Sequence, residues 1–117
     1  KNLLAPLREM PNRDSLAQIA DFLLPTEGID TVVVFGVRLG KVIISARTKR
    51  HGLHIGKVLS NHWKNGLAGG HRELAGGQIP FETILSEVPS DADAAIEESL
   101  AEIITQLKEI LPAPDEE

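Results

Sequence analysis

The chain has 117 residues, of which 42% are hydrophobic and 25% charged, a composition typical of an ordinary globular domain. This length is short for two domains, so we expect one. It contains no cysteine, which excludes disulfide staples, cysteine-ligated zinc and catalytic thiols and fits a reducing, cytoplasmic location. The net charge of -5 argues against a broad nonspecific grip on nucleic acid, and no apolar run approaches the roughly 18 residues of a membrane span, so we expect no membrane partner.

The N-terminal part of the chain is expected to be a linker that leads into a helix. Residues 1–14 are interpreted as the remnant of an interdomain linker. In residues 15–24 apolar side chains recur at helical spacing, and Ser15 and Gln18 have the spacing of a capping box. Pro25 is expected to end this helix.

Two β-branched segments and a second helix follow. Residues 30–37 and 41–47 are rich in valine and isoleucine, and the Arg-Leu-Gly between them is typical of a tight turn, so they predict a hairpin. Residues 54–64 place apolar side chains at three-and-four spacing, which predicts a short helix. Asn65 and Gly66 are a typical helix stop.

The last part of the chain is expected to hold a glycine-rich loop, a strand and a long helix. The loop lies in LAGGHRELAGGQI, residues 67–79. Ser90 and Asp93 have capping-box spacing, and the helix after them has one apolar and one acidic face. Residues 113–117 read as a frayed acidic tail. The predicted fold class is therefore α/β, a single domain over residues 15–112 with a mixed β-sheet and flanking helices.

Basic and acidic residues are separated along the chain. Residues 38–72 contain eight lysines and arginines and no acidic residue. Residues 82–117 are strongly acidic, with Lys108 as their only cation. This asymmetry predicts a surface on one side of the domain that faces an anion.

Several familiar motifs come close without matching. Residues 36–41 and 52–57 resemble a phosphate-binding loop, but each has three residues between glycine and Gly-Lys where that loop has four, and valine follows each lysine. No acidic residue falls within ten positions of His51, His54 or His62, so no metal site is expected in this chain.

The Gly-Gly-His stretch is the strongest candidate site. Backbone N–H groups freed of side chains can form a concave nest for an anion, to which His71 would add a hydrogen bond. Arg47, at the end of the second hairpin strand, can supply a planar fork for a phosphate or a base edge. The alternative is a structural turn followed by a strand whose glycines let a helix pack closely.

The order and spacing of these segments resemble a known family. GIDTVVVFGVRLGKVIISARTK, followed by HIGKVLSNHWKNGLAGGHRELAGGQIP, is similar to the DHH-associated C-terminal domain of the DHH phosphoesterase superfamily, and most similar to archaeal members. That superfamily includes RecJ-type exonucleases, oligoribonucleases that act on short RNA and dinucleotides, and exopolyphosphatase-related proteins. Its signature is a Gly-Gly-Gly-His loop followed by Ala-Ala-Gly-Gly, after a strand that ends in Ser-x-Arg-Ser.

The resemblance implies a substrate-binding site. The loop glycines and their histidine would hold the phosphate or sugar of the substrate, the strand arginine would contact the nucleotide, and the second glycine pair would support the loop. The matching substrate-binding residues are Ser45, Arg47, Ala68, Gly69, Gly70 and His71. The loop-supporting residues are Ala75, Gly76 and Gly77. The chain departs from the signature at Ala68 for the first loop glycine, Leu74 for the first alanine and Thr48 for the last serine.

The resemblance also implies what this chain lacks. Family members cut phosphodiester bonds with Mn²⁺ or Mg²⁺ ions held by a separate N-terminal domain that carries an Asp-His-His motif, and these 117 residues contain no such motif. The chain is therefore expected to bind substrate, with no cofactor or catalytic residue of its own, and to be inactive alone. Its expected partners are the N-terminal DHH domain, a nucleotide or short single-stranded oligonucleotide, and a second copy in a homodimer.

Two other functions stay open at this point. A similar domain appended to alanyl-tRNA synthetases serves RNA binding and dimerisation, although the compact Gly-Gly-His loop paired with Arg47 favours the phosphoesterase version. A regulatory or purely structural module is the third interpretation. The natural substrate also stays open among DNA, short RNA, a cyclic dinucleotide and polyphosphate.

Overall fold

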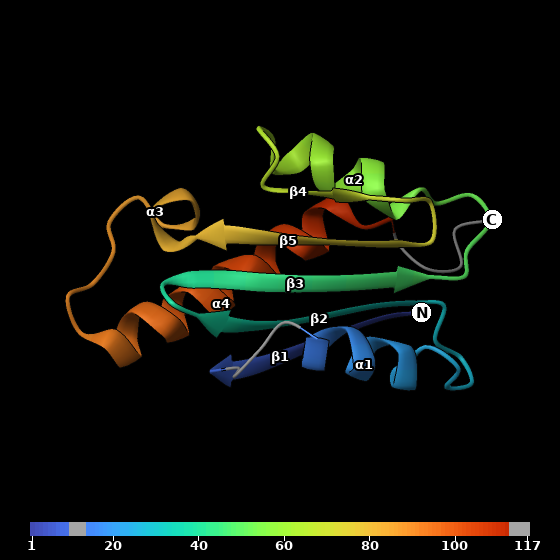
Figure 1. Cartoon of the computed structure of the whole chain (residues 1–117), viewed down its shortest axis with the longest axis horizontal. Helices are drawn as coiled ribbons and strands as arrows, with labels where there is room; N and C mark the ends of the chain where they lie inside the picture. Colours follow the sequence, from blue (N-terminus) through green and yellow to red (C-terminus); the bar gives the residue numbers. More distant parts are fainter. Residues whose placement is uncertain (10–13, 113–117) are drawn as a thin grey trace.

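A five-stranded mixed sheet organises the chain, of which the computed structural model describes residues 1–9 and 14–112 (Figure 1). The strand order is β1–β2–β3–β5–β4, with β1 parallel to β2 and the other neighbours antiparallel. The strands are β1 (Asn2–Glu9), β2 (Thr31–Arg38), β3 (Lys41–Thr48), β4 (Ala68–Gly70) and β5 (Leu74–Pro80). The helices are α1 (Asp14–Leu23), α2 (Ile55–His62), α3 (Phe81–Ile84) and α4 (Ala92–Ile110). The predicted α/β class, a mixed sheet with flanking helices, is confirmed.

The predicted hairpin forms the centre of the sheet. β2 and β3 pair in antiparallel register from Thr31 opposite Thr48 to Arg38 opposite Lys41. Leu39 and Gly40 join them with φ angles of 54° and 75°, the two positive values that a two-residue type I′ turn requires. Glycine suits this geometry, whereas Leu39 is an exposed side chain in a left-handed conformation.

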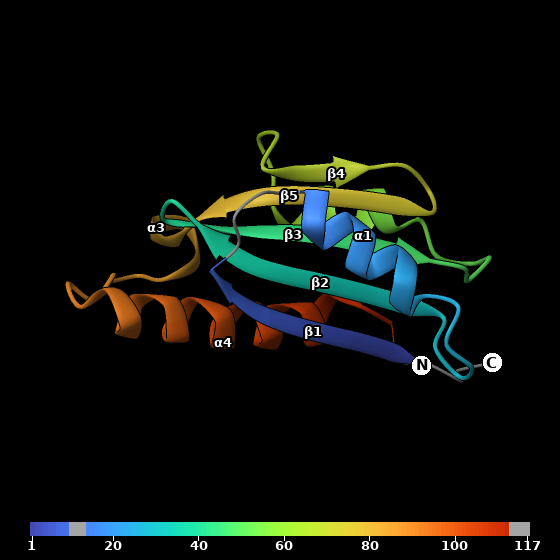
Figure 2. The same cartoon turned by 60° about the horizontal axis from the view of Figure 1, so that its bottom comes forward.

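Helices cover the two faces of the sheet unequally. Val32 and Val34 of β2 pack with α1, whereas Val33 and Phe35 face the core shared with α2 and α4. In Figure 1 α4 lies behind the sheet and α1 lies in front of the lower strands, where it packs against β2 and β3. The turned view of Figure 2 separates these two layers. The α1 layer is incomplete, because none of the helices among the described residues lies in front of β5 in Figure 1.

The N-terminal segment differs from the expected linker. Residues 2–9 form β1, which pairs with β2 from Asn2 opposite Thr31 to Pro6 opposite Phe35. Leu3 and Leu7 pack on the α1 side of the sheet, so the segment has the alternation of a strand. Pro6 is tolerated because β1 is an edge strand. Residues 10–13 of the expected linker and the expected acidic tail, residues 113–117, lie outside the described residues.

Two helix starts differ from the capping pattern in the sequence. α1 begins at Asp14, so Ser15 lies inside its first turn. α4 begins after Asp91, whose carboxylate accepts a hydrogen bond from the Ala94 N–H at 2.9 Å, and Ser90 lies one residue before this cap. α2 ends at His62, before the expected stop.

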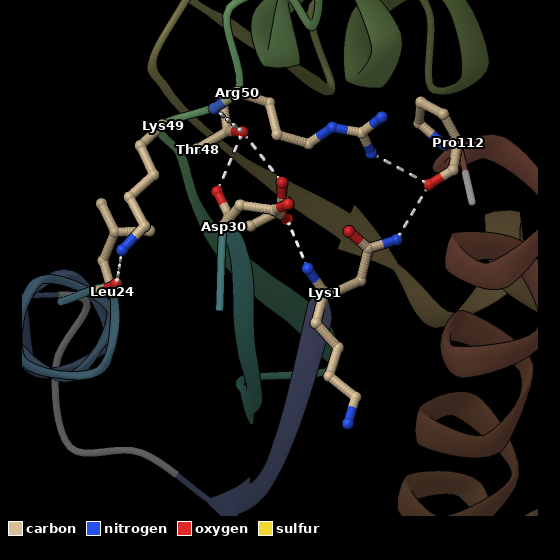
Figure 3. Close-up of polar contacts among 9 residues, drawn as sticks. Lys1, Leu24, Asp30, Thr48, Lys49, Arg50 and Pro112 are labelled. Atoms are coloured by element: carbon tan, nitrogen blue, oxygen red, sulfur yellow. Dashed lines mark hydrogen bonds and ion pairs between the residues drawn. The ribbon is translucent and has the colours of Figure 1, made fainter. Parts of the chain in front are cut away.

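The two ends of the described chain meet at one end of the sheet (Figure 3). The Pro112 carbonyl accepts hydrogen bonds from Asn2 Nδ2 at 3.0 Å and from Arg50 Nη1 at 3.3 Å. The main-chain nitrogen of Lys1 lies 2.9 Å from Asp30 Oδ1. β1, the segment after β3 and the segment after α4 are thus tied together.

Candidate functional site

A groove of about 650 Å³ opens on the face of the sheet that α1 leaves uncovered. Its floor includes Ser45 of β3, Gly76 of β5 and Gly69 of β4. Ser45 pairs with Gly76, and Gly76 pairs with Gly69, so the three lie in one row across three strands. Because two of the three have no side chain, the floor is largely bare main chain.

The groove lies between α1 and the turn that precedes β4. Asp14 and Ala17 line it from α1, and Gly66 and Leu67 line it from the turn. The polar side chains of the lining are the Asp14 carboxylate, the Gln78 amide and one serine hydroxyl. Among the described residues that line the groove there is no lysine, arginine or histidine. The groove itself is therefore suited to an uncharged, hydrogen-bonding group rather than to an anion.

A second row lies two positions further along each strand. Arg47 pairs with Leu74, and the His71 N–H donates to the Leu74 carbonyl at 2.7 Å. Residues opposite one another on antiparallel strands share a face, as do residues two apart on one strand. Arg47, Leu74 and His71 therefore form an edge row about 7 Å along the strands from the floor row. The register brings the two predicted ligands Arg47 and His71 beside Ser45 and Gly69.

Arg47 is partly occupied by groups of the protein. Its Nε donates to Asp21 Oδ1 of α1 at 2.8 Å, and its Nη1 donates to the Ala46 carbonyl at 2.9 Å. The Arg47 side chain is 13% exposed, whereas that of Asp21 is 65% exposed. Of the five N–H donors of a guanidinium, these bonds use two, which leaves three for a ligand as far as residues 1–9 and 14–112 are concerned. Arg47 thus ties α1 to β3 and keeps donors at the edge of the groove.

The Gly-Gly stretch is a short strand and not an isolated loop. Gly69 and Gly70, with φ angles of 159° and 153°, pair with Gly76 and Ala75. This extended pairing corrects the expectation of a concave nest, which needs alternating helical and left-handed residues. A Cβ atom on Gly70 would lie 2.6 Å from the Leu74 carbonyl oxygen and from Ala75 Cα, so close strand packing requires glycine there.

The β4–β5 turn is docked on the first turn of α2. Ile55 N donates to the Arg72 carbonyl at 3.0 Å, and Gly56 N donates to the His71 carbonyl at 2.9 Å. A Cβ atom on Gly56 would collide with the Gly70 carbonyl oxygen and lie 2.8 Å from that of His71. The N–H groups that a helix start can offer to an anion are used here to hold the turn.

The remaining predicted residues support the strands of the floor. Ala68 and Ala75 are buried in the core shared with α2 and α4. A Cβ atom on Gly76 would lie 2.9 Å from the Ile44 carbonyl oxygen, and one on Gly77 would lie 2.7 Å from that of Leu67. These glycines let β3, β5 and the turn before β4 approach one another. Gly77 and Ala68 also border the groove.

Sequence reasoning missed the contribution of α1. Asp14, Ala17 and Asp21 lie at helical positions i, i+3 and i+7, which place them on one flank of the helix. That spacing is a detectable signal, but only the packed structure tells which flank faces the groove. The contact between Asp21 and Arg47 joins residues 26 positions apart.

Neither a metal site nor a membrane span is found in the part of the chain that the structure describes. Within residues 1–9 and 14–112 no three histidine, aspartate or glutamate side chains are grouped so that they could hold an ion. The described residues therefore offer no ligand set for the Mn²⁺ or Mg²⁺ ions, which the resemblance assigns to a separate N-terminal domain. None of the described helices combines the length and apolarity that a bilayer crossing needs.

Comparisons with known proteins agree with this architecture. The model of the DHHA1 domain matches residues 2–113. An uncharacterised protein of Methanocaldococcus jannaschii is 44% identical over 78 residues, a match that covers 67% of this chain and only 16% of that relative. The structure of the C-Ala domain from Aquifex aeolicus alanyl-tRNA synthetase is similar with a TM-score of 0.63 at 19% identity, over 94% of this chain and 91% of that one. The chain belongs to the DHHA1 domain family, as its resemblance to DHH-associated domains implies.

Proposed function

We propose that this chain is the substrate-binding domain of a cytoplasmic DHH-family phosphodiesterase, and that it holds a nucleotide or short single-stranded oligonucleotide without cutting it. The observation that carries the proposal is the groove with its bare main-chain floor, beside the edge row of Arg47, Leu74 and His71. The floor row suits the nucleoside part of a nucleotide, and the edge row suits its phosphate.

In this proposal the nucleoside lies in the groove. A floor with few side chains accepts a flat base or a sugar in direct contact with the strands. The Ser45 hydroxyl and the Gln78 amide can each donate and accept hydrogen bonds, which suits base edges and sugar hydroxyls. The Asp14 carboxylate would repel a phosphate from the same space.

The phosphate lies at the edge row. Arg47 offers its unused N–H donors, and His71 lies two strands away in the same row. Leu74, which is 46% exposed between them, offers an apolar contact. Because the rows are about 7 Å apart, base or sugar and phosphate of one nucleotide can occupy them together.

The role proposed for this chain is positioning. The Mn²⁺ or Mg²⁺ ions and the catalytic groups would belong to an N-terminal DHH domain, and this chain would present the scissile phosphate to them. Holding a substrate in the reactive geometry removes much of the entropic part of a barrier. We assign no catalytic residue to the described part of the chain.

Titration with adenosine 5′-monophosphate, followed by amide NMR shifts, tests this function. We expect shifts at Ser45, Gly69 and Gly76, and a loss of about 1–3 kcal/mol of binding free energy in His71→Ala and in Arg47→Ala, the scale of charge-assisted hydrogen bonds. His51→Ala removes an exposed histidine outside the edge row and should bind as the parent chain does. Thermal melting of Arg47→Ala separates loss of the ligand contact from loss of the tie to Asp21.

The site is wrong if both the His71 and Arg47 variants retain the parent affinity. A second candidate function, an RNA-binding or dimerisation module like that appended to alanyl-tRNA synthetases, is favoured by the shared fold. That function predicts binding of structured RNA with no response of the floor glycines to the mononucleotide, whereas a dimer in sedimentation is compatible with both functions.

A further inference from the structure

The groove is bordered on the side opposite α1 by a basic rim. We use this name for Lys57, Ser60 and Lys64, which belong to α2 and to the turn after it. α1 presents the Asp14 carboxylate to the groove, so the two sides carry opposite charge. The position of each rim residue follows from the way α2 packs.

α2 packs with one flank toward α4 and the other toward β4. On the first flank His62 Nε2 and Gln106 Oε1 are 2.7 Å apart. On the second flank a Cβ atom built on Gly69 would lie 3.5 Å from Ser60 Cβ. Ser60 therefore lies beside the outer edge of β4, next to the glycine that forms part of the groove floor.

The two lysines lie on either side of this contact along the chain. Lys57 is exposed and stands three residues before Ser60, so the two share a helix flank. Lys64 is exposed in the turn after α2, where its carbonyl accepts from the Leu67 N–H at 3.3 Å. Leu67 lines the groove. The lysines are on the order of 10 Å apart by helical rise.

Neither lysine is used in an ion pair within residues 1–9 and 14–112. The first turn of α2 also contains no acidic residue. A helix start favours aspartate or glutamate, so Lys57 lies where a positive charge weakens the helix. The described contacts therefore give no sign that the positive charges of Lys57 and Lys64 stabilise the fold.

We propose that the basic rim is a phosphate-binding site for the nucleotides that follow the one held in the groove. The backbone of the substrate crosses the outer edge of β4, and its phosphates bind Lys57, Ser60 and Lys64. The ligand is therefore a single-stranded oligonucleotide with several phosphates, bound along the α2 side and away from Asp14. This inference rests on the proposed function and names the direction in which the substrate leaves the groove.

Isothermal titration of the chain with adenosine 5′-monophosphate and with the 5′-phosphorylated trinucleotide pApApA tests the rim. Lys57→Gln and Lys64→Gln should each weaken trinucleotide binding about threefold and leave mononucleotide binding unchanged, because only the longer ligand reaches the rim. The slope of log affinity against log salt concentration should fall by about 0.7 for each lysine removed.

Lys108→Gln is the matched control, since it removes an exposed lysine of α4 on the opposite face of the sheet. It should leave both ligands unaffected. If the mononucleotide binds at the floor glycines but both rim variants bind pApApA as the parent chain does, the rim is overturned and the proposed function stands. An equal loss in the Lys108 variant also overturns it, because the effect is then nonspecific. If neither ligand binds, the proposed function fails and the rim fails with it.

Discussion

Gly56 shows how one residue can hold two elements in contact. Its N–H donates to the His71 carbonyl, and no space remains for a side chain against the Gly70 carbonyl. The sequence around it, GLHIGK, resembles a phosphate loop, yet the structure explains this glycine by close packing of α2 on the β4–β5 turn.

Gly56→Ala should therefore lower the free energy of unfolding by about 1–3 kcal/mol, because the helix start must move away from the turn. Urea denaturation measures this change. Gly52→Ala is the control, since a Cβ atom there meets nothing within 4 Å, and we expect a change within about 0.5 kcal/mol. Equal stability of the two variants would contradict the packing explanation.

Some residues of the candidate site are positioned by strand pairing, and others are positioned by the packing of α1 on the sheet. Ser45, Gly69 and Gly76 were named from the sequence, and strand register alone brings them into one row. Asp14 and Asp21 were not named, because their roles depend on how α1 packs across the sheet. Neither the extended pairing of Gly69 and Gly70, which replaces the expected nest, nor the hydrogen bond from Arg47 to Asp21 is visible in local sequence.

At the scale of elements, the sequence predicts those helices and strands whose limits depend on residues close together in the chain. The β2–β3 hairpin follows from β-branched runs and a two-residue turn, and the start of α4 follows from a capping residue. β1 was missed because its partner in the sheet, β2, lies beyond α1, and Pro6 weakens the pattern of a strand. The two candidate caps of α4, Ser90 and Asp91, can be separated by experiment.

Asp91→Ala should cost about 1 kcal/mol of stability, the usual loss when a helix cap is removed, because the Ala94 N–H loses its acceptor. Ser90→Ala should be nearly neutral, since Ser90 precedes the cap. Thermal unfolding followed by circular dichroism measures both. A larger loss in the Ser90 variant would restore the capping box that the sequence pattern indicated.

At the scale of the whole molecule, β1 extends the folded domain to the first residues of the described chain. It covers the edge of β2, and Leu3, Leu4 and Leu7 pack against the two cores. β2 is buried along nearly its whole length, and it could not remain so as an edge strand. The segment that resembles a linker in the sequence is thus part of the sheet.

Removal of residues 1–9 should destabilise the chain by several kcal/mol, on the order of 1–2 kcal/mol for each of the three leucines. Chemical denaturation of the shortened chain measures this loss. Arg8→Ala in the full chain is the control, because its ion pairs with Asp93 and Glu97 are exposed and should contribute less than about 1 kcal/mol. A shortened chain as stable as the parent would support the linker interpretation.

The tie between Asn2 and Pro112 has a consequence for the order of folding. It joins residues 110 positions apart, so its loop-closure entropy is among the largest in the chain. The β2–β3 hairpin closes over a few residues and can form early, whereas contacts of long sequence separation form slowly. During synthesis β1 is made before α4, yet its bond to Pro112 must wait until α4 has been completed.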